Sequence, residues 1–303
     1  SIGVSWAIVF ARAGRSVRMQ DPDAARREAV PGEIAARLAQ LDEAGLLDEA
    51  PDAIAARVTV AADLAATVAR AGHVQECAPE RLELKRELFA RLDGLAAPDA
   101  VLASSSSAIV ASRFAEGLPG RARCLVVHPG NPPHLIPVVE VVPAPFTDPA
   151  VVERTVALLE AAGQSPVVVR REIEGFVFNR LQGALLREAY CLVRDGVASV
   201  DEVDRVVRDG LGRRWAFVGP FETADLNTRG GIASHAEKLG PAYARMGAER
   251  GQNDPWTPDL VEKVTAERRA LLPLEDWDER VAWRDRALIA LLRARRELSG
   301  REN

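Results

Sequence analysis

Short apolar segments alternate with helical segments up to Val169 of this 303-residue chain. The spacing of apolar residues switches repeatedly between the period of a strand and the period of a helix. Strands are expected at residues 16–20, 58–60, 73–77, 101–104, 124–128, 138–142 and 166–169, with helices at 2–13, 23–44, 64–71, 82–92, 108–114 and 149–162. This alternation predicts an α/β fold with a doubly wound, mostly parallel sheet.

The strand pattern ends at Glu174, and only helical segments follow. Residues 176–195 form one long helical pattern, and Ser199 with Glu202 forms a capping box that begins the next helix. Residues 277–298 form a last amphipathic pattern. We therefore expect two domains, an α/β domain of residues 1–172 and an all-α domain of residues 173–303.

The composition excludes several classes of protein. With 39 basic and 44 acidic residues the formal net charge is −5, which argues against a protein that mainly coats nucleic acid. Apolar residues make up 48% of the chain and charged residues 27%, a balance that predicts a folded protein. No segment approaches the ~20 consecutive apolar residues of a membrane span, and no signal peptide is evident. We expect neither a nucleic acid nor a membrane as a partner.

Residues that commonly bind metals or form disulfides are sparse. The cysteines are three, odd in number and far apart, so we expect reduced thiols and a cytoplasmic protein. They are Cys77, Cys124 and Cys191. Neither H-E-x-x-H nor C-x-x-C occurs, and no metal site is expected.

The first residues contain only part of a nucleotide-binding pattern. In G-x-G-x-x-G the glycines let backbone amides approach a pyrophosphate at a helix N-terminus. Here Ser1-Ile2-Gly3 matches the last three positions of that pattern, and a helix and a strand ending at Asp21 follow. The strand before the glycines is central in such a sheet, so a chain without it should expose a groove of unpaired backbone. We expect about ten upstream residues, the length of one strand and a turn; alternatively, Gly3 is an ordinary N-terminal glycine.

Five further segments occur in a fixed order along the chain. They are His73-Val-Gln-Glu-Cys-Ala-Pro-Glu80, Ala103-Ser-Ser-Ser-Ser107, His128-Pro-Gly-Asn-Pro132, Val139-Glu140-Val141 and Gly175-Phe-Val-Phe-Asn-Arg-Leu181. Together they resemble the 3-hydroxyacyl-CoA dehydrogenase superfamily. Three other segments are similar to its branch of lambda-crystallin and L-gulonate 3-dehydrogenase: Asn131-Pro-Pro133, Arg214-Trp-Ala-Phe-Val-Gly-Pro220 and Trp283-Arg-Asp285. The resemblance implies a Rossmann-like domain, a helical domain, NAD-dependent oxidation of a hydroxyl group, and a homodimer formed through the helical domain.

His128 ends a predicted buried strand, at the sheet edge where α/β proteins bind ligands. A histidine alone is more often structural. Glu140, however, follows twelve residues later inside Val-Val-Glu-Val-Val, where a carboxylate is costly unless it is paired. An imidazole is a natural partner, because the carboxylate fixes its tautomer and stabilises its charged form. The resemblance implies that His128 is the general acid/base and that Glu140 orients it.

The resemblance also assigns roles to three polar residues beside this pair. Ser107 would contact the substrate oxygen or the nicotinamide ribose, whereas the serines at 104–106 serve equally well as helix caps. Asn179 would donate to the substrate oxygen, an oxyanion-type contact; alternatively it is a helix-surface residue. Asn131 would contact the cofactor or hold its loop.

The cofactor residues follow from the same resemblance. Asp21 would accept hydrogen bonds from the adenosine ribose, and its charge disfavours a 2′-phosphate, so NAD is expected rather than NADP; alternatively Asp21 caps the next helix. Glu80 and Lys85 match positions that line the cofactor. Lys85 is one of three lysines in an arginine-rich chain, although an exposed helix lysine would need no explanation.

The substrate is less constrained. Relatives that use CoA bring a serine and a lysine to it, and the corresponding positions here are Arg37 and Ala44. Arg214 can bind a carboxylate through two parallel hydrogen bonds, so we expect it to anchor the free carboxylate of a small 3-hydroxy acid. The resemblance implies an acid similar to L-gulonate. Arg213 and Arg284 are alternative anchors. Trp215 could contact a quaternary ammonium, which keeps L-carnitine open. A 3-hydroxyacyl-CoA substrate and a non-catalytic, crystallin-like structural role are the remaining alternatives.

Overall fold

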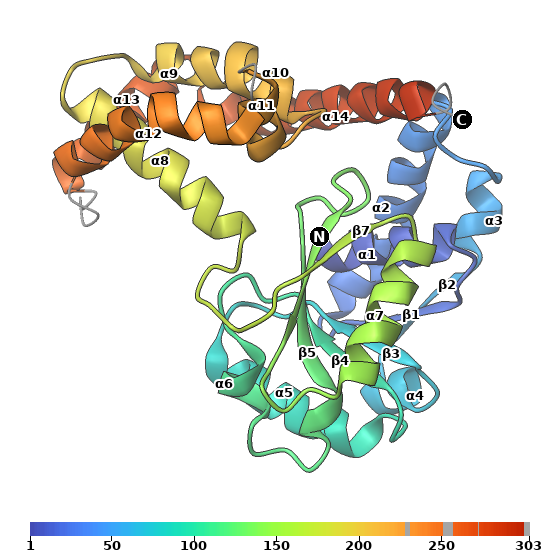
Figure 1. The fold of residues 1–303 in the computed structure, drawn as a ribbon. Helices are drawn as coiled ribbons and strands as arrows, with labels where there is room; N and C mark the ends of the chain where they lie inside the picture. The colour runs from blue at the N-terminus through green and yellow to red at the C-terminus, as the bar shows by residue number, and fades with distance from the viewer. Residues whose placement is uncertain (228–230, 251–256, 272, 300–303) are drawn as a thin grey trace. The chain divides into compact units, whose positions relative to one another are not determined.

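The computed structural model describes residues 1–227, 231–250, 257–271 and 273–299 (Figure 1). The chain forms two compact units, one of Ser1–Arg180 together with the residues from Ala282 onward, and one of Leu181–Val281. None of the helices in the described ranges is long and apolar enough to cross a membrane. The first unit carries every strand of the described chain, and it is described first.

Seven strands in the described residues form two separate sheets. They are β1 (Val17–Gln20), β2 (Val58–Ala61), β3 (His73–Glu76), β4 (Val101–Ser104), β5 (Cys124–Pro129), β6 (Val138–Pro143) and β7 (Ser165–Val168). One sheet pairs β1 with β2, and the other has the order β3-β4-β5-β6-β7. Only β5 and β6 are antiparallel, so the prediction of a mostly parallel sheet is confirmed.

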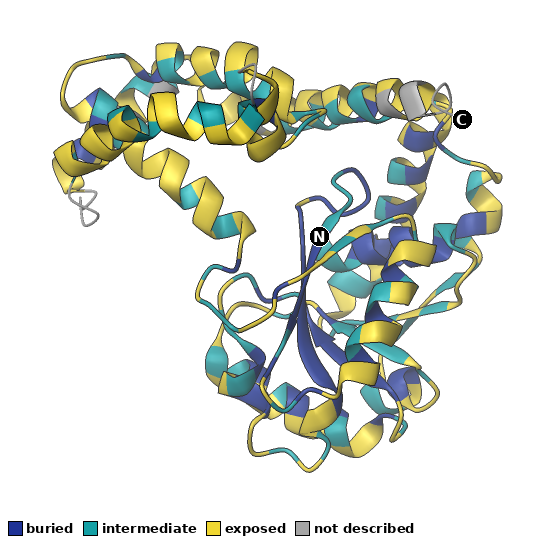
Figure 2. Cartoon of the chain, viewed as in Figure 1, coloured by how far each residue is buried: buried dark blue, intermediate teal, exposed yellow. Residues whose placement is uncertain are grey.

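Helices cover both faces of the larger sheet, as expected for a doubly wound fold (Figure 1). The helices of this unit are α1 (Ile2–Arg12), α2 (Ala24–Glu43), α3 (Pro51–Ala55), α4 (Leu64–Val68), α5 (Leu82–Leu95), α6 (Ala111–Ala115) and α7 (Pro149–Ala161). Leu102 and Val126 pack on one face, in a core with Phe89 of α5. Ala103 and Val127, the next residues along the same strands, pack on the other face against α1 and α7. Burial on both faces makes β4 and β5 continuously apolar and buried (Figure 2).

No described strand lies between β1 and β3. Because β1 pairs only with β2 and β3 only with β4, each leaves one edge without a strand partner. A groove with a volume of about 1680 Å³ lies between them and is lined by β1, β3 and one side of α1. The groove that the sequence predicts beside these strands is therefore present, and the sheet is divided in two.

After β7 the described residues form helices and turns and no further strand. The elements are α8 (Phe178–Arg194), α9 (Val200–Val206), a π-turn (Val207–Leu211), α10 (Gly212–Trp215), α11 (Pro220–Leu226), α12 (Gly231–Glu249), α13 (Pro258–Leu271), a 3₁₀ turn (Leu274–Asp276) and α14 (Trp277–Ser299). The predicted capping box is confirmed, because Ser199 and Glu202 exchange hydrogen bonds at the start of α9. α8 begins in the first unit and continues into the second, and α14 begins in the second unit and continues into the first.

The last helix departs from the expected division at residue 172. Ile289 is 8% exposed and packs, with Leu288 and Leu292, into the core formed by α1 and α2. Arg296 also forms an ion pair of 2.5 Å with Asp48 of the first unit. Most of α14 therefore belongs to the α/β unit, because its apolar face completes that core.

Candidate active site

His128 and Glu140 lie directly opposite each other on β5 and β6. Residues paired in this way across antiparallel strands project to the same side of the sheet. His128 Nδ1 is 2.8 Å from Glu140 Oε2, and the two residues are 8% and 3% exposed. The local cause is the short connection between β5 and β6, which returns the chain antiparallel to itself. The structure therefore brings together the two residues that the sequence pairs.

The two oxygens of the Glu140 carboxylate have different partners. Oε2 faces His128, whereas Oε1 accepts the backbone N–H groups of Val177 at 2.6 Å and Phe178 at 3.0 Å. Burial alone would raise the pKa of Glu140, but the hydrogen bonds from His128 and the two amides outweigh burial and hold this pKa below its usual value. An ionised carboxylate only accepts hydrogen bonds, so the proton of neutral His128 lies on Nδ1.

Two aromatic rings border the imidazole of His128. The ring of Phe176 is 5.6 Å away between centroids, at an interplanar angle of 54°. The ring of Phe178 is 6.3 Å away and nearly perpendicular. Within the described part of the chain, no hydrogen bond reaches Nε2 of His128. Nε2 is therefore the nitrogen that can exchange a proton with a ligand.

Ser107 and Asn179 are brought together from distant parts of the sequence. Asn179 lies in the first turn of α8, and its Nδ2 donates to the backbone carbonyl of Ser107 at 2.9 Å. One N–H of the Asn179 amide is thus used within the chain, and its second N–H and its carbonyl oxygen remain for other partners. The same turn supplies the amides that bind Glu140. The start of α8 therefore contacts both Ser107 and the carboxylate that holds His128.

Glu80 organises the turn that contains Ser107. Its carboxylate accepts the hydroxyl of Ser106 at 2.5 Å and the amides of Ile109, Ala108 and Ser107 at 3.1, 3.2 and 3.4 Å. Burial raises the pKa of Glu80, but these bonds outweigh it and the pKa falls below its usual value. The helix that follows, α6, begins at Ala111 rather than at the expected residue 108.

Lys85 lies beneath this turn and is 1% exposed. Its Nζ is 2.9 and 3.1 Å from the Glu76 carboxylate oxygens, 3.4 Å from Ser104 Oγ and 4.0 Å from Glu80. The alternative of an exposed helix lysine is therefore wrong. Glu76, its main partner, is not among the residues expected from the sequence, because the strand His73-Val-Gln-Glu76 contains no apolar run that would mark it as buried.

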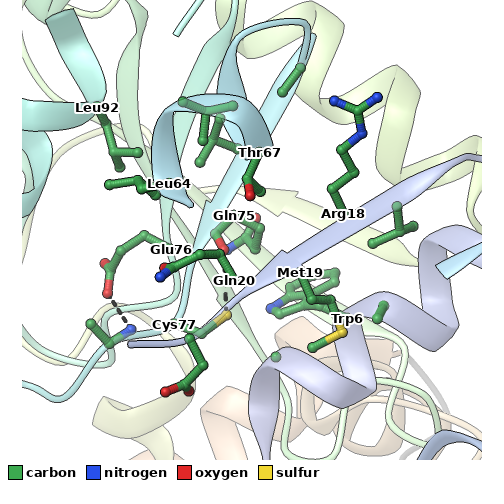
Figure 3. Close-up of a pocket in the computed structure, with 18 of the residues that line it drawn as sticks. Trp6, Arg18, Met19, Gln20, Leu64, Thr67, Gln75, Glu76, Cys77 and Leu92 are labelled. Atoms are coloured by element: carbon green, nitrogen blue, oxygen red, sulfur yellow. Dashed lines mark hydrogen bonds between the residues drawn. The ribbon is translucent and has the colours of Figure 1, made fainter. Parts of the chain in front are cut away.

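The groove between β1 and β3, shown in Figure 3, is lined by two of the predicted cofactor residues. It is bordered by Arg18, Met19 and Gln20 of β1 and by Gln75 and Glu76 of β3. Both Gly3 and the residue that follows β1, an aspartate at position 21, line it.

Neither of these two residues is explained by the packing of the chain itself. Asp21 does not cap α2, because the cap is Asp23, which accepts the Ala25 amide at 2.9 Å; Asp21 accepts the Asp23 amide instead. A Cβ on Gly3 would meet only Cys77 and Met19, at 3.8 Å, so internal packing does not require glycine there.

Two further predicted residues, Asn131 and Arg214, take no part in the hydrogen bonds described above. Asn131 is exposed, and among the described residues its side chain makes no hydrogen bond that would hold its loop. Arg214 lies in the helical unit, where its guanidinium donates to Asn227 at 3.3 Å. The described residues contain no cluster of side chains suited to a metal ion.

Comparisons with known proteins give one consistent picture. Residues 1–173 match the model of the 3-hydroxyacyl-CoA dehydrogenase NAD binding domain, and residues 175–271 match that of its C-terminal domain. The chain is 40% identical to a lambda-crystallin homolog of Bos taurus, covering 98% of this chain and 94% of that protein. It is 35% identical to an L-carnitine dehydrogenase of Pseudomonas putida, covering 97% and 90%.

A solved structure is similar over nearly the whole chain. It is that of 5-formyl-3-hydroxy-2-methylpyridine 4-carboxylic acid 5-dehydrogenase, described as an NAD⁺-dependent dismutase. The TM-score is 0.83 at 27% identity, with 96% of this chain and 94% of that chain covered.

Proposed function

We propose, since the chain belongs to the 3-hydroxyacyl-CoA dehydrogenase family, that it oxidises the 3-hydroxyl of a small hydroxy acid similar to L-gulonate to the 3-keto acid. The family consists of NAD-dependent dehydrogenases, and the first domain of this chain is its NAD-binding domain. The observation that carries the proposal is the buried pair of His128 and Glu140, with Nε2 of the histidine left open to a ligand.

In the proposed reaction His128 Nε2 accepts the hydroxyl proton of the substrate. The imidazolium that forms is stabilised by the Glu140 carboxylate, which already holds Nδ1. NAD⁺ supplies the acceptor for the hydride that leaves the same carbon. Asn179 and Ser107 would donate to the substrate oxygen as it changes from hydroxyl to carbonyl. In the reverse direction, His128 returns the proton.

The residues around the groove fit the adenosine end of NAD. Asp21 follows the end of β1, lines the groove and is free of the capping role that would explain it otherwise. Its carboxylate would accept hydrogen bonds from the ribose hydroxyls and would repel a 2′-phosphate. Gly3, in the first turn of α1, leaves the backbone open to a phosphate group. Glu80 would contribute indirectly, by holding the turn that contains Ser107. Lys85 would contribute through its ion pair with Glu76.

Two positions, one within α2 and one at its end, favour a free acid over a CoA thioester as the substrate. Arg37 occupies the position that corresponds to the CoA-contacting serine, and it binds Ser5 Oγ at 2.6 Å and Glu33 at 3.8 Å within the chain. The lysine position is Ala44, at the end of α2. We assign the substrate carboxylate to Arg214 and keep L-carnitine and 3-hydroxyacyl-CoA as alternatives.

The test is a panel of L-gulonate, L-carnitine and 3-hydroxybutyryl-CoA with NAD⁺, followed by the absorbance of NADH. We expect the highest kcat/KM with L-gulonate. Replacing His128 with Asn should lower kcat by about 10²–10⁴-fold, because a general acid/base is removed. His235→Asn, in α12, is the matched control and should leave kcat unchanged.

Two results would contradict the proposal. NAD binding without turnover of any hydroxy acid would favour the non-catalytic, crystallin-like role. A His128→Asn variant as active as the wild type would remove the assigned acid/base. A preference for L-carnitine or the thioester would instead change the substrate and keep the mechanism.

A further inference from the structure

The turn that leads into α8 holds a phenylalanine in an unusual backbone conformation. Gly175 has a φ of +74°, and Phe176, with a φ of +48°, is the one non-glycine residue of the described ranges in the left-handed region. A residue with a Cβ adopts this conformation only when its surroundings hold it there. The Phe176 amide donates to Ile173 at 3.1 Å, and its side chain is fully buried.

The buried side chain of Phe176 meets His128. Its ring lies in the core formed by the sheet, α5 and α6, and its centroid is 5.6 Å from that of the imidazole. An aromatic ring held against an imidazole limits rotation of the imidazole about its Cβ–Cγ bond. Phe178 adds a nearly perpendicular contact at 6.3 Å but is much more exposed.

The same turn delivers two hydrogen bonds to the partner of His128. Directly after Phe176, the amides of Val177 and Phe178 donate to Oε1 of Glu140, whose Oε2 faces His128. The left-handed pair of residues reverses the chain just before these amides. The reversal therefore sets the ring against the imidazole and the amides against the carboxylate at once.

We propose that Phe176 is a positioning residue for His128, an inference that rests on the proposed function. Its ring restricts the plane of the imidazole, so that Nδ1 stays on Glu140 and Nε2 stays available to the substrate hydroxyl. The left-handed backbone at Phe176 places the ring against His128 and the two following amides against Glu140.

Two variants distinguish the effect of the Phe176 ring from the effect of its backbone conformation. Phe176→Leu keeps an apolar side chain without the ring, whereas Phe176→Gly suits the left-handed backbone and removes the side chain. Phe89→Leu is the matched control, because Phe89 is equally buried in the same core but contacts the ring of Phe114 at 4.4 Å rather than His128. With the best hydroxy acid, both Phe176 variants should lose about 10- to 100-fold in kcat at little-changed KM. Phe89→Leu should keep kcat, measured below its own unfolding temperature.

A second readout does not depend on turnover. In nitrogen-detected NMR, His128 should show one tautomer with the proton on Nδ1 in the wild type and in Phe89→Leu, and a mixture of ring states in both Phe176 variants. Wild-type kcat and a single tautomer in Phe176→Gly would overturn the inference, as would equal losses of kcat in Phe176→Leu and Phe89→Leu. If the wild type oxidises no hydroxy acid, the proposed function fails, and the NMR comparison still decides the positioning role.

Discussion

At the scale of single residues, the Glu140 carboxylate determines the protonation pattern of the candidate active site. It accepts three hydrogen bonds, from His128 and from the amides of Val177 and Phe178, and it is almost completely buried. Each donor needs an acceptor there, because an unpaired polar group at a buried position is costly. A substitution that keeps the shape of the Glu140 side chain but removes its charge therefore tests the role of the charge alone.

Glu140→Gln should preserve the shape and reverse the tautomer of His128. The side-chain oxygen of glutamine can still accept the amides of Val177 and Phe178, which turns its NH₂ group toward His128 Nδ1. Nδ1 must then accept, and the proton moves to Nε2, where it blocks proton uptake from the substrate. We expect kcat to fall by up to about 10⁴-fold, the loss seen when the aspartate of a Ser-His-Asp triad is replaced by asparagine and the histidine takes the wrong tautomer. Steady-state rates of NADH formation measure this, and Glu140→Asp with a similar loss would argue for geometry rather than tautomer.

A second buried histidine makes stability depend on pH. His134 is 8% exposed and bonds to Ser5 Oγ at 3.1 Å. Its pKa is lowered from 6.5 to about 4, first by burial and then by the charge of Arg37, with Asp285 opposing the shift. In the unfolded chain His134 therefore binds a proton near pH 6.5, whereas in the folded chain it binds one only near pH 4.

This difference predicts a loss of stability as the pH falls. The contribution of neutral His134 is fully present above its unfolded pKa and declines toward pH 4, by at most about 1.4 kcal/mol per pH unit. His134→Gln should flatten the dependence between these limits. It should not abolish the dependence, because burial also lowers the pKa of His73. Urea unfolding at a series of pH values measures this, and parallel curves for wild type and variant would contradict it.

At the scale of elements, a buried ion pair joins α5 to β3 and β4. Lys85 and Glu76 are 1% and 4% exposed and 2.9 Å apart, and Ser104 Oγ donates to the same carboxylate at 2.5 Å. Removing one member of such a pair leaves a buried charge without compensation, whereas removing both is far less costly. The pair holds the ends of the two strands that precede the turns of Glu80 and Ser107.

Lys85→Met should destabilise the protein by about 3–5 kcal/mol, because Glu76 then remains buried and unpaired. The double variant Lys85→Met with Glu76→Gln should recover most of this loss, since the amide oxygen can still accept the Ala78 amide. Arg86→Met is the control on the same helix, where the exposed pair with Glu83 contributes little. Denaturant unfolding of the four proteins checks the prediction, which fails if the double variant is no more stable than the single one.

The elements also show what could be predicted from the sequence and why. β4 and β5 were predictable because burial on both faces leaves a continuous apolar run. The pairing of His128 with Glu140 followed from the cost of a lone buried carboxylate. The environment of Lys85 could not be predicted in the same way, because a lysine in an amphipathic helix carries no mark of its partner on another element. The turn before α8 is marked in the sequence by Gly175, but the left-handed backbone of Phe176 could not be predicted, since a positive φ at a residue with a Cβ is imposed by tertiary contacts.

At the scale of the whole molecule, the two units differ in how well a single chain covers their apolar side chains. In the α/β unit three clusters of buried residues are built on the sheet and its helices. In the helical unit most of the described residues are exposed or half-buried (Figure 2), and many large apolar side chains are among the exposed ones. Those exposed by more than half include Leu181, Val206, Phe217, Phe221, Leu226, Tyr243 and Met246. Apolar surface on this scale is typical of an interface, and we propose that a second copy of the chain covers it.

A charged residue in this surface should therefore weaken the dimer. Phe221 is 82% exposed and Leu226 is 70% exposed, both on α11. Replacing both with Glu should shift the protein from about twice 32.7 kDa to the mass of one chain in light scattering at micromolar concentration, because desolvating an unpaired carboxylate costs far more than the burial of the two side chains gains. Leu95→Glu, at a 38% exposed position in the α/β unit, is the control and should remain a dimer. A monomeric wild type would contradict the proposal. A double variant that is still dimeric would exclude α11 from the interface.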